Sequence, residues 1–129
     1  MRFLRKKDIL LFHNRSIERF GGVHGVTNDP GLDSALIAAE NRFHYEQADV
    51  AACAAAYAYH LTMAHAFLDG NKRVAAVATE VFIAINDMEL GASDDELYDL
   101  FMSIASGSLR RDDVEVALRG WLRPARDLA

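Results

Sequence analysis

The chain has 129 residues, of which 51% are hydrophobic, and its formal net charge at pH 7 is -5. This length and composition predict one compact domain, residues 1–129, that buries roughly two-thirds of the surface exposed by the unfolded chain. The acidic balance and the dispersed basic residues argue against direct binding of nucleic acid, which needs Lys and Arg clustered on one face.

The first twelve residues combine positive charge with a short apolar run, Ile9-Leu10-Leu11-Phe12. Four apolar residues are too few for the core of a signal peptide or for a membrane span, so we expect no membrane association and a cytoplasmic location. The only cysteine, Cys53, cannot form an internal disulfide. This agrees with a reducing compartment, and we expect Cys53 to serve packing.

The first predicted helix runs from Asp8 to Arg19, where apolar residues recur near the helical period. The segment from Gly21 to Asn28 contains three glycines and predicts a loop or a short glycine-rich flap. Asp29-Pro30 begins a second helix that ends near Tyr45. Its apolar face is formed by Leu32, Leu36, Ala39 and Phe43.

Two later segments, Val50 to Met63 and Val74 to Ile85, are apolar on nearly every side, which predicts a central, buried pair of helices. Ser93 and Glu96 stand at the spacing of a capping box and predict the start of the next helix. A last helix is expected from Asp112 to Leu122. Because strand signals are almost absent, the predicted fold is all-α, a compact bundle of about six helices with a short glycine-rich flap.

The two buried helices are joined by the run His65-Ala66-Phe67-Leu68-Asp69-Gly70-Asn71-Lys72-Arg73. Its second half falls in the first turn of the later helix, where backbone N–H groups lack intrahelical partners and the helix dipole is positive. Gly70, Asn71 and Lys72 are therefore predicted to frame an anion site, to which Lys72 and Arg73 add charge suited to phosphate.

Three further side chains of this run have predicted roles. Asp69 is a candidate ligand for Mg²⁺, which usually takes one or two carboxylates together with phosphate oxygens and water. His65 can accept a proton from an attacking hydroxyl, because imidazole titrates near neutral pH. Phe67 is expected to point into the core and pin the loop.

The remaining histidines give weaker signals. His44 and His60, taken with Cys53, show no recognised zinc spacing, so we expect no structural metal. His13 and His24 are expected to be surface residues, with His24 in the flap.

In the nine-residue run the chain resembles the Fic/Doc family, whose signature is a His, a Phe two residues later, an acidic residue, a small residue, an Asn and an Arg. The matching residues are His65, Phe67, Asp69, Gly70, Asn71 and Arg73. The segments Gly21-Gly22, Asp29-Pro30-Gly31-Leu32 and Ser34-Ala35-Leu36 also look like family members. The resemblance implies the Fic/Doc fold and transfer of part of ATP to a protein hydroxyl, usually AMP in the Fic branch and a phosphoryl group in the Doc branch.

Two departures from the Fic pattern favour the Doc branch. Lys72 stands where Fic proteins have a second glycine that makes room for the phosphates, and Ala76 stands where they have another arginine. Both look like the Doc toxins, in which ATP lies in the reverse sense and presents its terminal phosphate. The resemblance implies phosphorylation of a Thr or Ser of a translation factor, with elongation factor Tu as the target, and arrest of translation and growth.

By this resemblance each residue of the motif acquires a role. His65 orients or deprotonates the target hydroxyl, and Asp69 holds Mg²⁺ against the phosphates of ATP. Asn71, Lys72 and Arg73 stabilise the charge that develops on the transferred group.

The flap has two interpretations. In the family a comparable segment lets the backbone of the target dock as an added strand, which makes Val23, His24 and Gly25 the candidate docking residues. The alternative is a plain loop between helices.

Regulation is expected to come from a second protein. Fic proteins that restrain themselves use a Ser or Thr followed four positions later by Glu and then Gly or Asn, and the nearest candidate here has Leu36 before Glu40-Asn41. The resemblance therefore implies a cognate antitoxin whose disordered tail folds on binding. Two alternatives stay open: a Fic-type AMP transferase acting on a protein hydroxyl, and a non-catalytic antitoxin-binding module. The oligomeric state also stays open.

Overall fold

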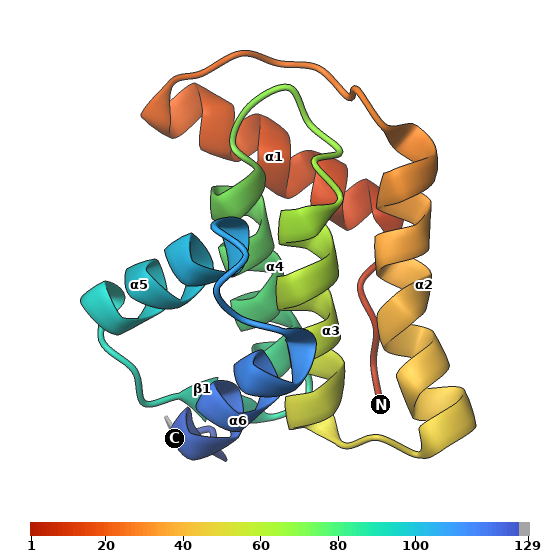
Figure 1. Ribbon diagram of the computed structural model, residues 1–129, viewed down its shortest axis with the longest axis vertical. Coiled ribbons are helices and arrows are strands. Elements are labelled where there is room, and N and C mark those ends of the chain that lie inside the picture. Colours follow the sequence, from red (N-terminus) through yellow and green to blue (C-terminus); the bar gives the residue numbers. More distant parts are fainter. Residues whose placement is uncertain (127–129) are drawn as a thin grey trace.

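The computed structural model describes residues 1–126, and these residues form a bundle of six α-helices (Figure 1). The all-α prediction is confirmed, and each predicted helix lies within three residues of an observed one at both ends. The helices are α1 Lys6–Phe20, α2 Asp29–Glu46, α3 Val50–Met63, α4 Asn71–Ile85, α5 Asp94–Ala105 and α6 Arg111–Trp121. Two short strands, β1 Met88–Leu90 and β2 Leu122–Pro124, pair antiparallel and were not predicted.

Helix α3 is the centre of the bundle. It contacts α2, α4, α5 and α6, and every residue from Ala51 to Ala58 is buried. Most of these side chains are alanine, which lets the neighbouring helices approach closely. Cys53 is fully buried among them, as predicted. Helix α3 is apolar on every side because neighbouring helices surround it.

Helix α4 differs from the prediction that it would be buried all round. It buries Val74, Ala75 and Phe82 against the core, but Ala76 and Val77 are only half-buried. These two small side chains line a cavity that separates part of α4 from α5. The apolar side chains of α4 therefore form part of a concave surface as well as part of the core.

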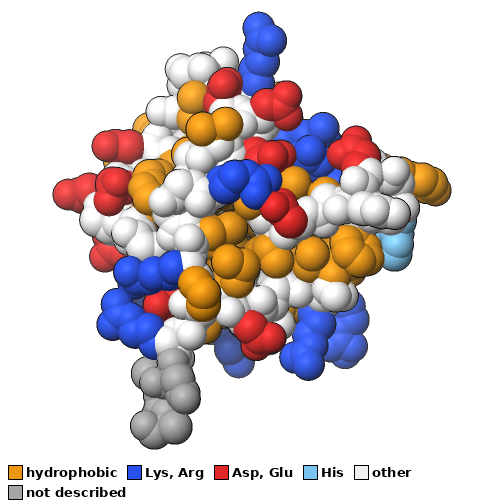
Figure 2. All heavy atoms as spheres, turned by 90° about the horizontal axis from the view of Figure 1, so that it is seen from below, with side chains coloured by type: hydrophobic (Ala, Val, Ile, Leu, Met, Phe, Trp, Pro, Cys, Tyr) orange, Lys and Arg blue, Asp and Glu red, His pale blue; other side chains and the backbone are white. Residues whose placement is uncertain are grey.

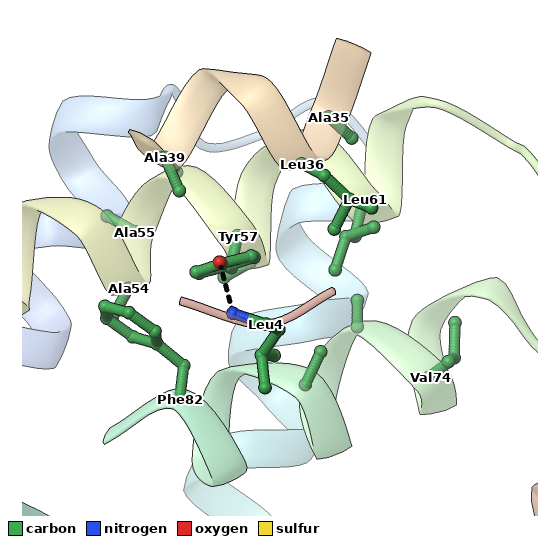
Figure 3. Close-up of a cluster of buried hydrophobic side chains, with 14 of the residues drawn as sticks. Leu4, Ala35, Leu36, Ala39, Ala54, Ala55, Tyr57, Leu61, Val74 and Phe82 are labelled. Atoms are coloured by element: carbon green, nitrogen blue, oxygen red, sulfur yellow. Dashed lines mark hydrogen bonds between the residues drawn. The ribbon is translucent and has the colours of Figure 1, made fainter. Parts of the chain in front are cut away.

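The N-terminal arm, residues 1–5, fills the space between α2 and α4. The backbone N–H of Leu4 donates a hydrogen bond to the Tyr57 hydroxyl at 3.0 Å, inside a cluster of apolar side chains (Figure 3). The ring of Phe3 lies 5.7 Å from that of Phe43 on α2 and 6.0 Å from that of Phe82 on α4. Local periodicity did not predict these contacts, because the arm has no regular secondary structure.

Helix α1 crosses the end of the bundle where α3 and α4 are joined, and the segment from Gly21 to Asn28 passes over the same joint (Figure 1). The nine-residue motif is therefore held between helices on one side and the flap on the other. A loop positioned by rigid helices keeps its side chains in a defined arrangement.

None of the helices within residues 1–126 combines the length and the apolar composition that a membrane span requires. On the face drawn in Figure 2, acidic and basic side chains both surround a strip of apolar ones. That mixture agrees with the dispersed charge expected from the sequence.

Candidate active site

The motif forms a tight loop between α3 and α4. His65, two residues after the end of α3, has a φ of 46°, in the left-handed region that non-glycine residues seldom adopt. Gly70 has a φ of 79° and precedes the first residue of α4, Asn71. Both turns confirm the predicted place of the motif at a helix junction. A strained histidine of this kind is typical of functional sites, where the surrounding structure holds it.

The side chain of Asn71 closes this loop. Its Oδ1 accepts a hydrogen bond from the Phe67 backbone N–H at 3.0 Å, and its Nδ2 donates one to the Phe67 carbonyl at 2.8 Å. Phe67 is only 3% exposed, so the prediction that it pins the loop in the core is confirmed. The hydrogen bonds of Asn71 give it a structural role, and its action on phosphate stays a prediction.

His13 corrects the sequence interpretation. It was expected at the surface, but it is 2% exposed, and its ring stacks on Phe67 with centroids 3.9 Å apart and planes at 12°. The signal was present in the sequence, because His13 lies four residues after Ile9 and four before Ile17, on the same buried stripe of α1. Polarity alone suggested exposure, whereas helical spacing indicated burial.

The flap pairs with the motif loop through its backbone. Val26 and Phe67 form an isolated antiparallel bridge, and the Leu68 N–H donates to the Gly25 carbonyl at 3.0 Å. The start of the flap also approaches the loop, since the Val23 N–H donates to Oδ2 of Asp69 at 3.2 Å. Gly22 has a φ of 123°, which strains any residue with a side chain, and a Cβ there would lie 2.6 Å from that oxygen and displace the carboxylate.

A cavity of about 830 Å³ opens beside the loop. One end is lined by His65 and by every residue from Asp69 to Arg73, and the other by apolar side chains of α5 such as Leu97 and Phe101. The cavity thus brings together all six motif residues predicted to act on phosphate or hydroxyl groups. Val23, His24 and Gly25 lie outside its lining, on the flap.

The polar end of this cavity has free positive charge. Helix α4 begins after Gly70 with no side chain capping it, so its first-turn N–H groups are available to an anion. Lys72 and Arg73 are exposed beside it. The Arg73 guanidinium lies 4.8 Å from the centroid of the Phe20 ring, a cation–π distance. Sequence reasoning missed Phe20, because it is the last residue of α1 and lies far from the motif in sequence.

The carboxylate of Asp69 suits the predicted magnesium ion. Its Oδ1 accepts a hydrogen bond from the Gly70 N–H at 2.8 Å, its Oδ2 accepts from Val23, and each oxygen keeps a lone pair. Among residues 1–126 no three His, Cys, Asp or Glu side chains converge in a metal-binding group. The protein would therefore offer one carboxylate, an arrangement that fits Mg²⁺ when phosphate and water supply the other ligands.

One carboxyl group of the cavity wall has a shifted pKa. Desolvation raises the pKa of Glu80, and the negative charge of Asp94 adds a smaller increase. Both residues line the cavity between α4 and α5.

The model of the Fic/DOC family matches residues 3–83, a span that includes the flap and the whole motif loop. The chain belongs to the Fic/Doc family. It is also 31% identical over 121 residues to "Protein kinase doc" of Escherichia phage P1, an alignment that covers 92% of this chain and 94% of that protein. The resemblance inferred from the motif, including the Doc branch, is thereby confirmed. In this Fic/Doc chain Phe20 lines the cavity together with the motif residues, and His13 contacts the motif loop without lining the cavity.

Proposed function

We propose that this chain is a Doc-type toxin that acts as a protein kinase, transferring the terminal phosphate of ATP to a Thr or Ser hydroxyl of a translation factor. The observation that carries the proposal is the polar end of the cavity. There, His65 and Asp69 lie beside the uncapped start of α4, with Lys72 and Arg73 exposed next to it. The likeness to the phage P1 protein named a kinase supports the same chemistry.

The reaction needs a base, a phosphate site and a path for the leaving group. His65 takes the proton of the target hydroxyl, and the hydroxyl oxygen forms a bond to the terminal phosphorus as the bond from that phosphorus to the bridging oxygen breaks, releasing ADP. The N–H groups of the first turn of α4, with Lys72 and Arg73, hold the oxygens on which charge develops. Asp69 would hold Mg²⁺, which when bound neutralises phosphate charge.

Two residues support transfer of the terminal phosphate rather than AMP. Lys72 places a long cationic side chain at the start of α4, where the Fic branch keeps glycine, and Ala76 places a methyl group at the cavity wall. The reversed nucleotide presents its terminal phosphate to His65, while the base and ribose extend away from the lysine.

The proposal extends to partners. Elongation factor Tu is the proposed target, and a cognate antitoxin is the proposed inhibitor, both on the strength of the Doc likeness. The flap supports a docking role, because Gly25 and Val26 already pair with the motif loop and bring the flap next to the cavity. An added strand of the target at the flap would be held close to His65. The proposed action on elongation factor Tu implies a cytoplasmic location.

The test is one transfer reaction with mass readout. The purified chain is incubated with elongation factor Tu, Mg²⁺ and ATP labelled on the terminal phosphate, and the intact mass of the target is measured. The proposal predicts the gain of one phosphate, and His65→Ala should lower the rate by a factor of about 10² to 10⁴. His44→Ala serves as the control, because His44 is exposed on α2 and away from the cavity.

Three results would contradict the proposal in different ways. The gain of an adenylate would make the protein an AMP transferase. An unmodified factor combined with labelling of another cell protein would change the target. Growth arrest that persists in the His65→Ala variant, with no protein modified, would indicate a non-catalytic module.

A further inference from the structure

His13 touches the motif at more than one point, although it belongs to another helix. Its Nε2 lies 2.8 Å from the carbonyl oxygen of Asp69, a residue 56 positions later. A carbonyl oxygen can only accept, so Nε2 carries the proton and donates. The His13 ring also stacks on the ring of Phe67. It lies close to Gly70 as well, since a Cβ added at Gly70 would be 3.8 Å from the imidazole. One buried ring thus contacts two residues of the loop, Asp69 and Phe67, and lies close to a third, Gly70.

The hydrogen bond fixes the direction of the Asp69–Gly70 peptide. In a trans peptide the C=O and N–H groups point in opposite directions. With the carbonyl turned toward His13 on α1, the Gly70 N–H points away from α1, and it donates to Oδ1 of Asp69 at 2.8 Å. The same N–H therefore orients the carboxylate that is the candidate magnesium ligand.

The backbone alone does not select this direction. Gly70 has a φ of 79°, and glycine adopts positive and negative φ about equally well. A flip of the peptide would leave the Asp69 carboxylate with the hydrogen bond from Val23 alone and turn a carbonyl dipole toward the start of α4, where an anion is expected. A group outside the loop is needed to keep the peptide in the observed direction, and His13 is the side chain in contact with it.

We propose that His13 is a positioning residue for the phosphate end of the cavity, holding the Asp69–Gly70 peptide so that Gly70 keeps the Asp69 carboxylate in place. The link to nucleotide rests on the proposed function. The link to the loop conformation does not, which lets the two be tested apart.

Two substitutions separate hydrogen bonding from packing. His13→Phe keeps a ring that can stack on Phe67 but removes the donor, whereas His13→Gln places an amide nitrogen near the position of Nε2 but removes the ring. If the hydrogen bond matters, His13→Gln should keep the loop conformation and the affinity for ADP, and His13→Phe should not. If His13 only fills space, Phe is the better replacement.

The readouts are the three-bond couplings between the Gly70 amide and Hα protons, which report the φ angle of Gly70, and the affinity for ADP with Mg²⁺ by calorimetry. For His13→Phe we expect changed Gly70 couplings and about fivefold weaker ADP binding, the effect of one hydrogen bond. For His13→Gln we expect both values close to those of the parent protein. Equal losses in the two variants, or an undisturbed Phe variant, would overturn the inference.

A measurement on the unchanged protein guards against a variant that does not fold. Ring ¹⁵N shifts of His13 report its tautomer, and the inference requires a proton on Nε2. A neutral ring protonated on Nδ1 alone would overturn it without any substitution. Absence of phosphate transfer, with the Gly70 couplings changed in the Phe variant, would refute the proposed function and leave the role of His13 intact.

Discussion

Thr62 offers a direct test of how the cavity floor is built. It lies in the last turns of α3, is 1% exposed, and its hydroxyl has no hydrogen-bond partner among the described residues. A buried hydroxyl without a partner costs about 1–3 kcal/mol of stability. Valine has the same shape and the same branching at Cβ, so Thr62→Val removes this cost without opening a cavity. We expect the free energy of unfolding to rise by about 1–2 kcal/mol.

Thr79 on α4 supplies the matched control. It is also 1% exposed, but its Oγ1 donates a hydrogen bond to the Ala75 carbonyl at 2.8 Å. Thr79→Val removes that bond, whose net contribution is about 1 kcal/mol, so the substitution should be neutral or slightly destabilising. The two substitutions change the same atoms and differ only in whether the hydroxyl is paired.

Urea denaturation of the parent and both variants measures the effect, with unchanged m-values as evidence that the unfolded states are comparable. For a domain of this size, 1 kcal/mol corresponds to roughly 3–5 °C in Tm. Destabilisation of Thr62→Val, or equal effects of the two substitutions, would refute the reasoning. Either outcome would mean that the Thr62 hydroxyl has a hydrogen-bond partner, such as a bound water. A loss of ADP affinity in a stable Thr62→Val variant would instead show that a ligand uses the hydroxyl.

Two further predictions concern the motif and the surface. His65→Gly should abolish transfer yet raise the free energy of unfolding by about 0.5–1 kcal/mol, because glycine relieves the strain of a φ of 46°; a urea titration showing lower stability would contradict this. A hydrogen bond from Arg119 lowers the pKa of Asp49 in the folded protein. The stability that this pair contributes is complete above the ordinary carboxyl pKa and is lost as the pH falls through the lowered pKa of Asp49. Arg119→Gln should raise the pKa of Asp49 in an NMR titration, and an unchanged value would count against the pairing.

Much of the fold could be predicted because helix signals are local. The capping box appears as expected, with the Ser93 hydroxyl accepting from the Glu96 N–H at 3.1 Å and the Glu96 carboxylate accepting from the Ser93 N–H at 3.0 Å. The apolar composition of α3 correctly predicted the central helix. The motif also fell at the predicted junction, because its glycine and its polar residues separate two apolar segments.

The contacts that complete the site were harder to predict because their partners are far apart in sequence. His13 and Asp69 are 56 residues apart. Phe20 and Arg73 meet only because α1 crosses the joint between α3 and α4. Neither pair follows a local period, and a polar residue on a buried stripe gives a conflicting signal. The N-terminal arm is a similar case, since Leu4 finds its partner, Tyr57, on a distant helix.

Periodicity and motif spacing are properties of neighbouring residues, so the helices, the family and the groups available for phosphate chemistry could be inferred from the order of the residues. Which groups meet around that chemistry depends on how the helices pack in three dimensions. The packing places a buried histidine behind the loop, a phenylalanine beneath Arg73 and apolar side chains of α5 in the wall of the same cavity. Such contacts depend on how helices cross, and crossing is set by the packing of the whole core.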